Sequence, residues 1–328
     1  MLKSGRVILI VLAAMTQSHA AILFRAGFES GDLEEASSVH TARPGTVTNM
    51  ANPHRDVANP TERVVQYMTT GDSERAELRV HGVSELGEYW YGWQVFIPED
   101  WQPAERGPEG GGNDIITQWH RGGRLPKWAR GHPMTLNIDD DGRYHMTWNY
   151  GGPDRVEKGA VIEQINANDD KGKWTHWAFH VKWAKEDTPG GGFMRLYHNG
   201  SLVFSHDGPN HENLKTWMMW KAGIYHGNPS ALPKDPYVLL GDNYILADAA
   251  SSLAEVNPYL EAGNANGSPG TAHCAASGEE SDTKLNLAIR GKQLRIEANL
   301  PSGTRQFEMR IESSRNNGSA IWKGAIPQ

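Results

Sequence analysis

The sequence predicts an all-β fold in which two sheets pack as a sandwich or jelly roll. Short runs of alternating apolar and polar residues recur along the chain, which is the period-2 pattern of β-strands. Gly, Pro, Asn and Asp residues separate these runs, and segments with helical periodicity are almost absent. The 12 Trp, 10 Tyr and 36 Gly residues fit either a Trp-rich sandwich core or an aromatic-lined surface for sugars.

The clearest predicted strands, in chain order, are 89–97, 134–138, 144–148, 177–183, 193–198 and 201–204. Two pairs of them are expected to form hairpins. Asp139-Asp140-Asp141-Gly142 joins the second and third strands, and Asn199-Gly200 joins the last two. Asn-Gly between two alternating runs is the strongest short-range hairpin signal, because both turn residues tolerate positive φ. Many short strands at this spacing indicate a sandwich or jelly roll.

The chain begins with the features of a cleavable secretion signal. Lys3 and Arg6 precede an apolar stretch, and Ser18-His19-Ala20 is a small-x-small cleavage site. We therefore predict a signal peptide over residues 1–20 and a secreted or periplasmic protein. The apolar stretch is too short to cross a bilayer, and no later stretch is long enough, so no membrane span is predicted.

Composition divides the remaining chain into three parts. Residues 21–262 carry most of the strand pattern and form the predicted main domain. Residues 263–283 are rich in Gly, Asn, Ser and Ala without periodicity, which predicts a linker. Residues 284–328 are expected to form a small β module, because apolar residues alternate in three runs there: Leu285/Leu287/Ile289, Leu294/Ile296/Ala298 and Phe307/Met309/Ile311. Surface attachment, secretion sorting and packing on the main domain all remain open for this module.

Charge argues against one class of function, and the cysteine content rules out an intrachain disulfide. The formal net charge is −7, and loss of Lys3 and Arg6 with the signal makes it more negative, which argues against nucleic acid as a partner. A local basic surface can still bind an anion in an acidic protein. Cys274 is the single cysteine, so no intrachain disulfide can form.

Three distant segments place polar side chains in strand alternation. They are Arg75-Ala76-Glu77-Leu78-Arg79, Gln118-Trp119-His120 and Lys221-Ala222-Gly223-Ile224-Tyr225. Residues i and i+2 of a strand share a face, so each segment presents its polar side chains on one side. A surface that combined guanidinium, amide, imidazole, ammonium and phenol groups would suit removal of a proton next to a carboxylate. An ion pair between Arg75 and Glu77 with no catalytic role is the simpler alternative.

Together these three motifs resemble the jelly-roll polysaccharide lyases. Arg-x-Glu-Leu-Arg, Gln-x-His and Lys-Ala-Gly-x-Tyr are similar, in order and separation, to the alginate lyase signature. Other segments look more like heparin lyase I and glucuronan lyase; they are 28–33, 174–177, 241–244 and 255–258. The resemblance covers about residues 21–262 and implies a concanavalin A-like sandwich of two sheets. Trp119 and the His226-Gly227 pair depart from the alginate lyase pattern.

The resemblance implies a role for each matching residue. Tyr225 would take the C5 proton of a uronate and return a proton to the glycosidic oxygen at C4, and His120 would assist or act as the base. Gln118 and Arg75 would hold the carboxylate, whose enediolate form needs nearby donors and cations. Other groups implied or expected to contact the polyanion are Arg79, Lys221, Glu77, Arg121 and Arg124. A solvated loop is the alternative for the last two, which lie in a Gly/Pro-rich stretch.

Stereochemistry does not decide which residue acts as the base. In glucuronate or mannuronate, H5 and the C4 oxygen leave from the same side, so Tyr225 alone could serve. Guluronate or iduronate needs a second group on the opposite face, for which His120 is the candidate. We therefore expect a lyase of a 4-linked uronate polymer, of glucuronan first and of alginate or a glycosaminoglycan next.

Two other classes of function compete with this one. A non-catalytic carbohydrate-binding protein of the same fold is the main alternative. A glycoside hydrolase is less favoured, because such enzymes need paired carboxylates and the sequence has no Glu-x-Asp-x-x-Glu run. No cofactor is expected for catalysis. A structural calcium ion is predicted at Glu29 and Asp242, which match segments where relatives of this fold hold one.

Overall fold

The computed structural model divides the chain into two compact units, Met1–Gly267 and Ser268–Gln328. In the first unit it describes residues 20–42, 44–70, 73–83, 86–104, 114–122, 134–154, 156–214, 217–226 and 236–257. In the second unit it describes the backbone of four strands. Residues 1–19 of the predicted signal peptide (1–20) and the predicted linker 263–283 lie outside the described residues.

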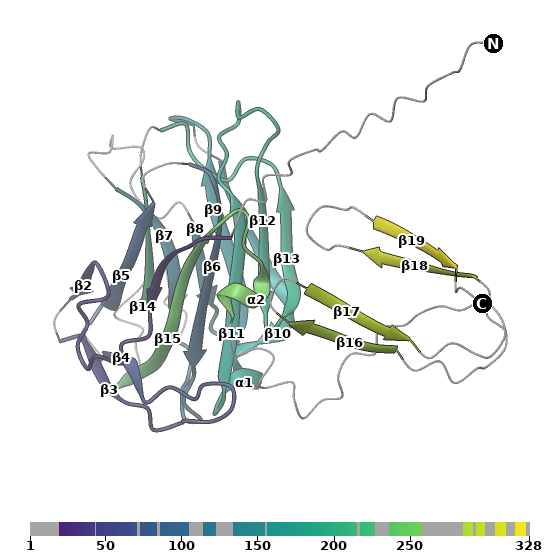
Figure 1. Cartoon of the computed structure of the whole chain (residues 1–328). Helices are drawn as coiled ribbons and strands as arrows, with labels where there is room; N and C mark the ends of the chain where they lie inside the picture. Colours follow the sequence, from purple (N-terminus) through teal and green to yellow (C-terminus); the bar gives the residue numbers. More distant parts are fainter. Residues whose placement is uncertain are drawn as a thin grey trace, which may run out of the picture. The chain divides into compact units, whose positions relative to one another are not determined.

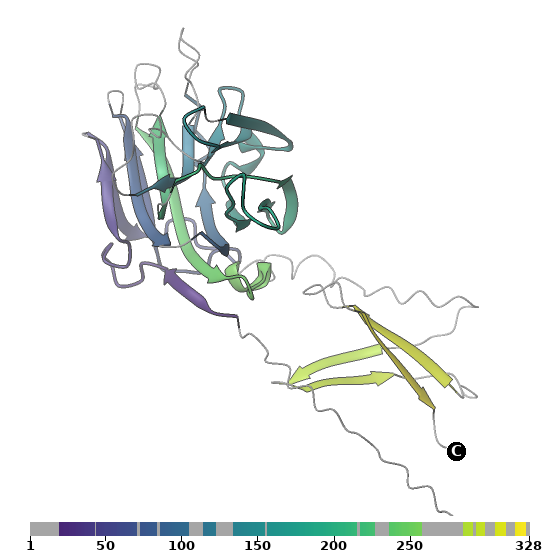
Figure 2. The same ribbon diagram turned by 90° about the horizontal axis from the view of Figure 1, so that it is seen from above.

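The first unit is a sandwich of two antiparallel sheets, as the alternating pattern predicts (Figures 1 and 2). The eight-stranded sheet has the order β13 (Ser201–Asp207), β12 (Phe193–His198), β11 (Trp174–Lys182), β6 (Glu88–Phe96), β15 (Tyr237–Asp248), β4 (Arg63–Thr69) and β3 (Thr46–Ala51), with β1 (Ile22–Ala26) also paired to β15. The seven-stranded sheet has the order β10 (Val156–Asn166), β9 (Arg143–Tyr150), β8 (Met134–Ile138), β7 (Asp114–Arg121), β14 (Met218–His226), β5 (Arg75–Val83) and β2 (Ser38–Thr41). Two short helices, α1 (Ala167–Asp170) and α2 (Leu253–Val256), are the helical elements in the described part of the chain.

Both predicted hairpins are present. β8 pairs with β9 and β12 pairs with β13, each antiparallel. Asn199 and Gly200 have φ values of 47° and 82°, so both turn residues occupy the left-handed region that a tight hairpin turn requires. The turn predicted from Asn199-Gly200 is therefore confirmed, together with the positive φ angles on which the prediction rests.

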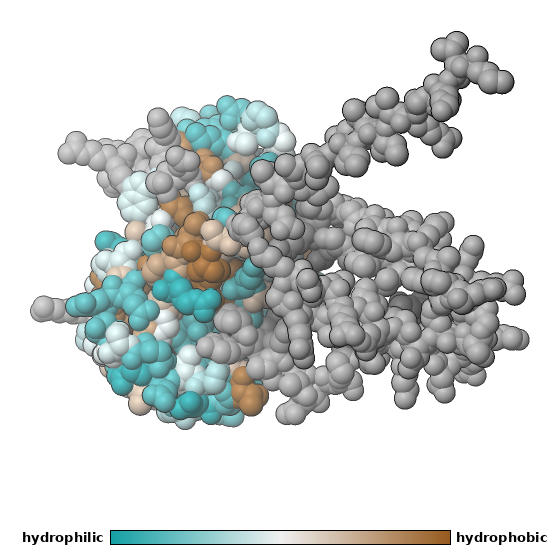
Figure 3. Space-filling model, in the orientation of Figure 1, coloured by the Kyte–Doolittle hydropathy of each residue, from teal (hydrophilic) through white to brown (hydrophobic). Residues whose placement is uncertain are grey.

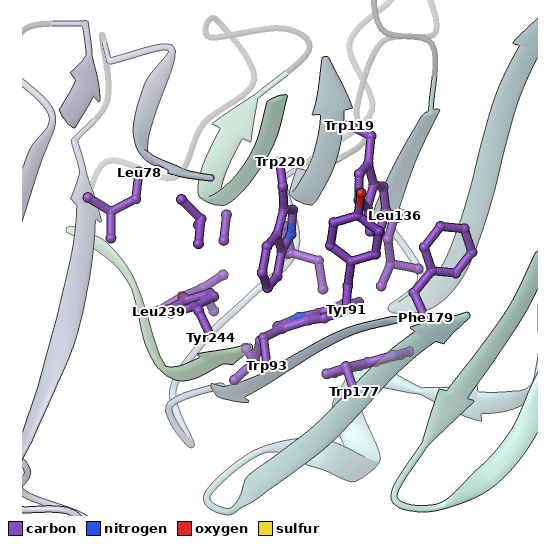
Figure 4. Packing of buried hydrophobic residues seen from close by; sticks show 14 of the residues in the cluster. Leu78, Tyr91, Trp93, Trp119, Leu136, Trp177, Phe179, Trp220, Leu239 and Tyr244 are labelled. Carbon is purple, nitrogen blue, oxygen red and sulfur yellow. The ribbon is translucent and has the colours of Figure 1, made fainter. Parts of the chain in front are cut away.

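The core between the sheets is built from large aromatic side chains (Figure 4). Trp93 and Trp177 come from the eight-stranded sheet, whereas Trp119 and Trp220 come from the seven-stranded sheet. Trp93 meets Trp119 and Trp220 edge to face, with ring centroids 6.1 and 5.8 Å apart. Such edge-to-face pairs are favoured by the ring quadrupole. Because these residues point inward, their neighbours in the strand sequence must point out of the sandwich.

The outer face of the eight-stranded sheet is mostly hydrophilic on the side shown in Figure 3, with apolar side chains gathered in one patch. A small apolar cluster on this sheet packs beneath α2 and consists of Trp90, Ala178, Ile245, Ala247 and Val256. None of the helices in the described ranges is long and apolar enough to span a membrane.

The second unit contains two antiparallel hairpins. β16 (Leu285–Arg290) pairs with β17 (Gln293–Ala298), and β18 (Gln306–Glu312) pairs with β19 (Ser319–Ala325). The first three strands coincide with the three alternating runs of the sequence. The strand at β19 was not predicted, because its apolar residues are fewer and are interrupted by Lys323 and Gly324.

Gly223 is required where it stands in β14. Its φ is +134°, and an added methyl group would overlap the carbonyl oxygen of Ala76 and lie 2.8 Å from the ring of Tyr67. We expect Gly223→Ala to lower the free energy of unfolding by about 1–3 kcal/mol, the usual cost of such backbone strain. Urea denaturation measures this free energy. Gly152→Ala is the control, because a methyl group at Gly152 would meet nothing within 4 Å. Equal stability of the two variants would contradict the geometry.

Candidate functional site

The three motif segments lie on adjacent strands, in the order β7, β14, β5. Lys221 is in register with Gln118 on one side and with Arg79 on the other, and Tyr225 is opposite Arg75. The face of the seven-stranded sheet turned away from the core, here called the polar face, carries all of these side chains. Segments up to 150 positions apart in the chain, such as those of Arg75 and Tyr225, are therefore neighbours.

Glu77 lies at the centre of this arrangement and is 2 % exposed. Its Oε1 accepts a hydrogen bond from the amide of Gln118. Its Oε2 lies 3.5 Å from Nη1 of Arg75 and 3.8 Å from Nζ of Lys221. Burial raises the pKa of Glu77, although Lys221, Gln118 and Arg75 act in the opposite direction. One buried carboxylate thus fixes groups from three strands.

Gln118 is fully buried and one of its amide hydrogens is used by Glu77. In this conformation it therefore supports the carboxylate of Glu77, and only its second N–H could donate to a substrate. Burial lowers the pKa of Lys221, partly offset by Glu77. Arg75 keeps 15 % of its side chain exposed, so its guanidinium remains accessible from the polar face.

Tyr225 is half-buried beside Arg75 and Glu74. The guanidinium carbon of Arg75 lies 4.0 Å from the centroid of the Tyr225 ring. Burial and a hydrogen bond with Glu74 raise the pKa of Tyr225, and Arg75 lowers it only in part. The phenol is therefore protonated at neutral pH, which suits a proton donor. Burial and Glu74 therefore outweigh the effect of the nearby cation on the pKa of Tyr225.

The pKa of His120 shifts in the opposite direction. Its Nδ1 lies 2.6 Å from the carbonyl oxygen of Arg121, so Nδ1 carries the hydrogen and donates it. Burial, together with the charge of Lys221, lowers the pKa of His120 to about 4. The imidazole is then neutral at neutral pH, with the lone pair on Nε2. A neutral imidazole is the form that can accept a proton.

His40 of β2 is a further member of the site that the sequence did not identify. Its Nδ1 lies 3.3 Å from Nη1 of Arg75, 3.3 Å from Nζ of Lys221 and 3.7 Å from Oε2 of Glu77. Burial and these cations lower the pKa of His40 to about 4. His40 sits in the short run Ser38-Val39-His40-Thr41, which matches no motif. Only the pairing of β2 with β5 places it opposite Glu77.

One of the predicted substrate-binding residues, Arg121, is not on the polar face. Arg121 alternates with His120, so it points into the sandwich, where it is fully buried and forms an ion pair with Glu212. Its prediction as a substrate contact is therefore wrong, and its role is structural. Arg124 lies outside the described residues.

A buried hydrogen-bonded network anchors the end of β14 directly after Tyr225. His226 Nδ1 lies 2.5 Å from Asp114 Oδ1, and its Nε2 lies 2.8 Å from Thr69 Oγ1. The hydroxyl of Tyr237 donates to the other oxygen of Asp114. Because His226 follows Tyr225 directly, this network restricts the backbone that carries the phenol.

Glu29 and Asp242, the predicted calcium ligands, both accept hydrogen bonds from the protein. Asp242 is buried and accepts from Thr61 Oγ1 at 2.6 Å, from Asn59 Nδ2 at 2.9 Å and from its neighbour's backbone amide. Glu29 accepts from the backbone amides of residues 62 and 63. In the described ranges, no group of three or more His, Cys, Asp or Glu side chains gathers as metal ligands do. As arranged, Asp242 and Glu29 are satisfied by protein donors and do not form the oxygen cage that calcium takes. Chelation tests the predicted ion.

The fold and the polar face together define a jelly-roll protein equipped with acid–base groups and cations for an anionic ligand. Comparison with known families agrees: the family model described as polysaccharide lyase matches residues 28–243. The chain belongs to this polysaccharide lyase family, and the protein is a lyase. No match was found among curated proteins.

Solved structures resemble this chain to different degrees, and the first of them shares its fold. The endo-β-1,4-glucuronan lyase of the fungus Trichoderma reesei is 16% identical, with a TM-score of 0.57, and the match covers 72% of this chain and 98% of that one. The alginate lyase vAL-1 of a Chlorella virus is 11% identical, with a TM-score of 0.45, covering 65% of this chain and 92% of that one. An alginate lyase from Aplysia kurodai is 8% identical, with a TM-score of 0.45 and coverage of 69% and 99%.

Replacing Glu77 tests whether it holds the polar face together. We expect Glu77→Gln to lower the free energy of unfolding by about 3–5 kcal/mol, because the buried cations lose their partner. Chemical denaturation at neutral pH measures it. Glu74→Gln is the matched control: Glu74 also pairs with Arg75 but is 43 % exposed, so about 1 kcal/mol or less is expected. A Glu77→Gln protein as stable as the control would contradict this role.

Chelation tests the calcium ion. Because protein donors satisfy Asp242 and Glu29, we expect an excess of chelator to leave the Tm unchanged. A fall in Tm that added Ca²⁺ restores would instead support the predicted ion and would show that the cluster rearranges around it.

Proposed function

We propose that the protein is an exported lyase that cleaves a 4-linked uronate polymer by β-elimination. Glucuronan is the first candidate substrate, and alginate or a glycosaminoglycan comes next. The observation that carries the proposal is the grouping of Arg75, Lys221 and Gln118 around Glu77 on the face that also bears His120 and Tyr225. Similarity to the fold of a protein described as a glucuronan lyase supports the order of candidates.

The cations address the difficult step of the reaction. A proton next to an ionised carboxylate is weakly acidic, because its removal adds a second negative charge to the same group. Arg75, Arg79 and Lys221 would hold the carboxylate and stabilise the enediolate that develops, while the buried Gln118 holds Glu77 in place. Fixed donors aimed at developing negative charge are commonly the largest contribution to catalysis.

The pKa directions divide the acid and base roles that the sequence left open. His120, neutral at neutral pH, would take the C5 proton on Nε2. The electron pair of that C–H bond then forms the C4–C5 double bond while the bond from C4 to the glycosidic oxygen breaks. Tyr225, protonated at neutral pH, would donate its hydroxyl proton to the departing oxygen. Proton exchange with solvent would then restore both groups, and this sequence of steps requires no cofactor.

His40 supports the same chemistry as a positioning residue. It contacts both Arg75 and Lys221, and in its neutral form it adds no further charge to the cations that it touches. Export rests on the N-terminal sequence pattern of residues 1–20. Recovery of the mature protein beginning near Ala21 from periplasm or medium would test it.

A panel of polyuronates tests the reaction itself. We expect wild-type protein to raise ultraviolet absorbance with glucuronan or another 4-linked polyuronate, because each cleavage creates a C4–C5 double bond. Tyr225→Phe and His120→Ala should each lower kcat by about 10²–10⁴-fold, the usual contribution of positioned acid–base groups. Tyr197→Phe is the control, because it removes a phenol hydroxyl from the other sheet. Binding without any cleavage by folded wild type would favour a carbohydrate-binding protein instead.

The pH dependence of kcat/KM tests the division of roles. The base works when deprotonated, so activity should be lost as pH falls through the pKa of His120, near 4 in the free enzyme. The acid works when protonated, so activity should fall only as pH rises above the ordinary phenol value of about 10. We expect a plateau between these limits. Activity that climbs steadily toward pH 10 would show that Tyr225 is the base.

A further inference from the structure

Trp217 extends the polar face beyond the proposed catalytic groups. It directly precedes β14 and shares its alternation with Met219 and Lys221, so its side chain lies on the same face as they do. Its backbone carbonyl accepts a hydrogen bond of 2.9 Å from the amide of Gly122, just after β7. At about 3.3 Å per residue, Trp217 stands roughly 13 Å along the strand from Lys221.

The indole of Trp217 lies over two glycines, one on each flanking segment. A methyl group added at Gly122 would overlap the indole ring. A methyl group added at Gly82 of β5 would lie 3.4 Å from atoms Cε3 and Cζ3 of the same ring. The absence of side chains at these two positions leaves room for the indole against the backbone of the sheet.

Trp217 is also the exposed exception among the tryptophans whose side chains the structure describes. It is 39% exposed, whereas each of the others is at most 7% exposed. An exposed indole lacks the hydrophobic stabilisation that the buried indoles gain from the removal of their surface from water. The ring is nevertheless seated on two glycines, and Arg79 and Lys221 are the next charged residues along the two strands on the same face.

We propose that Trp217 is the stacking platform of a sugar subsite next to the one that holds the reacting uronate. The occupant is a pyranose ring of the same anionic polysaccharide, so the inference rests on the proposed function. One face of a pyranose presents C–H groups and stacks on an indole, while its carboxylate remains free to reach a cation. Trp217 stands opposite Gly122, two positions after His120, so this sugar neighbours the reacting uronate on the side away from Tyr225. The platform therefore acts on chains that extend past the reacting uronate and not on the chemical step.

Oligosaccharides of two lengths test the subsite. The probes are size-fractionated fragments of whichever polyuronate the wild type cleaves, one just long enough to be cleaved and one several residues longer. We expect Trp217→Ala to raise KM for the long fragment about tenfold, the size of one aromatic contact, with kcat unchanged. The short fragment should react as with wild type. Trp217→Phe, which keeps a smaller ring, should recover part of the loss.

Two further variants complete the test. Gly122→Ala keeps the indole but displaces it, so it should reproduce the KM effect of Trp217→Ala. Leu202→Ala, which removes an exposed apolar side chain from the other sheet, is the control and should change neither fragment. Equal KM values for wild type and Trp217→Ala with the long fragment, or equal losses for both fragments, would overturn the subsite. A wild type that cleaves no polyuronate would instead overturn the proposed function and, with it, the subsite.

Discussion

A single buried carboxylate organises the polar face. Glu77 receives Gln118 from β7, Lys221 from β14, Arg75 from its own strand and His40 from β2. A carboxylate buried without partners would be strongly unfavourable, and the same holds for a buried ammonium group. The Glu77 carboxylate and the buried ammonium group of Lys221 therefore stabilise each other. This mutual stabilisation favours the register in which β2, β5, β7 and β14 bring their side chains together. The aromatic core on the opposite side of the same strands fixes which residues can take part, since inward and outward positions alternate.

The same burial sets the protonation states that elimination needs. It lowers the pKa of His120 and His40, both of which lie near cations, so these imidazoles stay neutral. It raises the pKa of Tyr225, and Glu74 adds to the effect, so the phenol keeps its proton. Burial thus shifts the pKa values of the proposed base and the proposed acid in opposite directions, because imidazole is charged when protonated and phenol when deprotonated.

Much of the fold could be predicted from local sequence, because alternation and turn chemistry are local properties. The Asn199-Gly200 turn and the outward positions of Glu77 and Lys221 follow from such patterns. His40 could not be predicted, because its place depends on the pairing of β2 with β5, which no local pattern encodes. The prediction for Arg121 is wrong because it follows the positive charge of the side chain and the neighbouring loop. The alternation of Arg121 with His120 points its side chain into the core. The raised pKa of Tyr225 depends on burial and on Glu74, which sequence spacing does not reveal.

The most direct measurement is a crystal structure of the Tyr225→Phe variant with an oligouronate bound. The account predicts one sugar carboxylate within hydrogen-bonding distance of Arg75 and Lys221, with its C5 atom next to Nε2 of His120. A sugar chain bound on the eight-stranded sheet, or one whose carboxylates avoid Arg75 and Lys221, would contradict it.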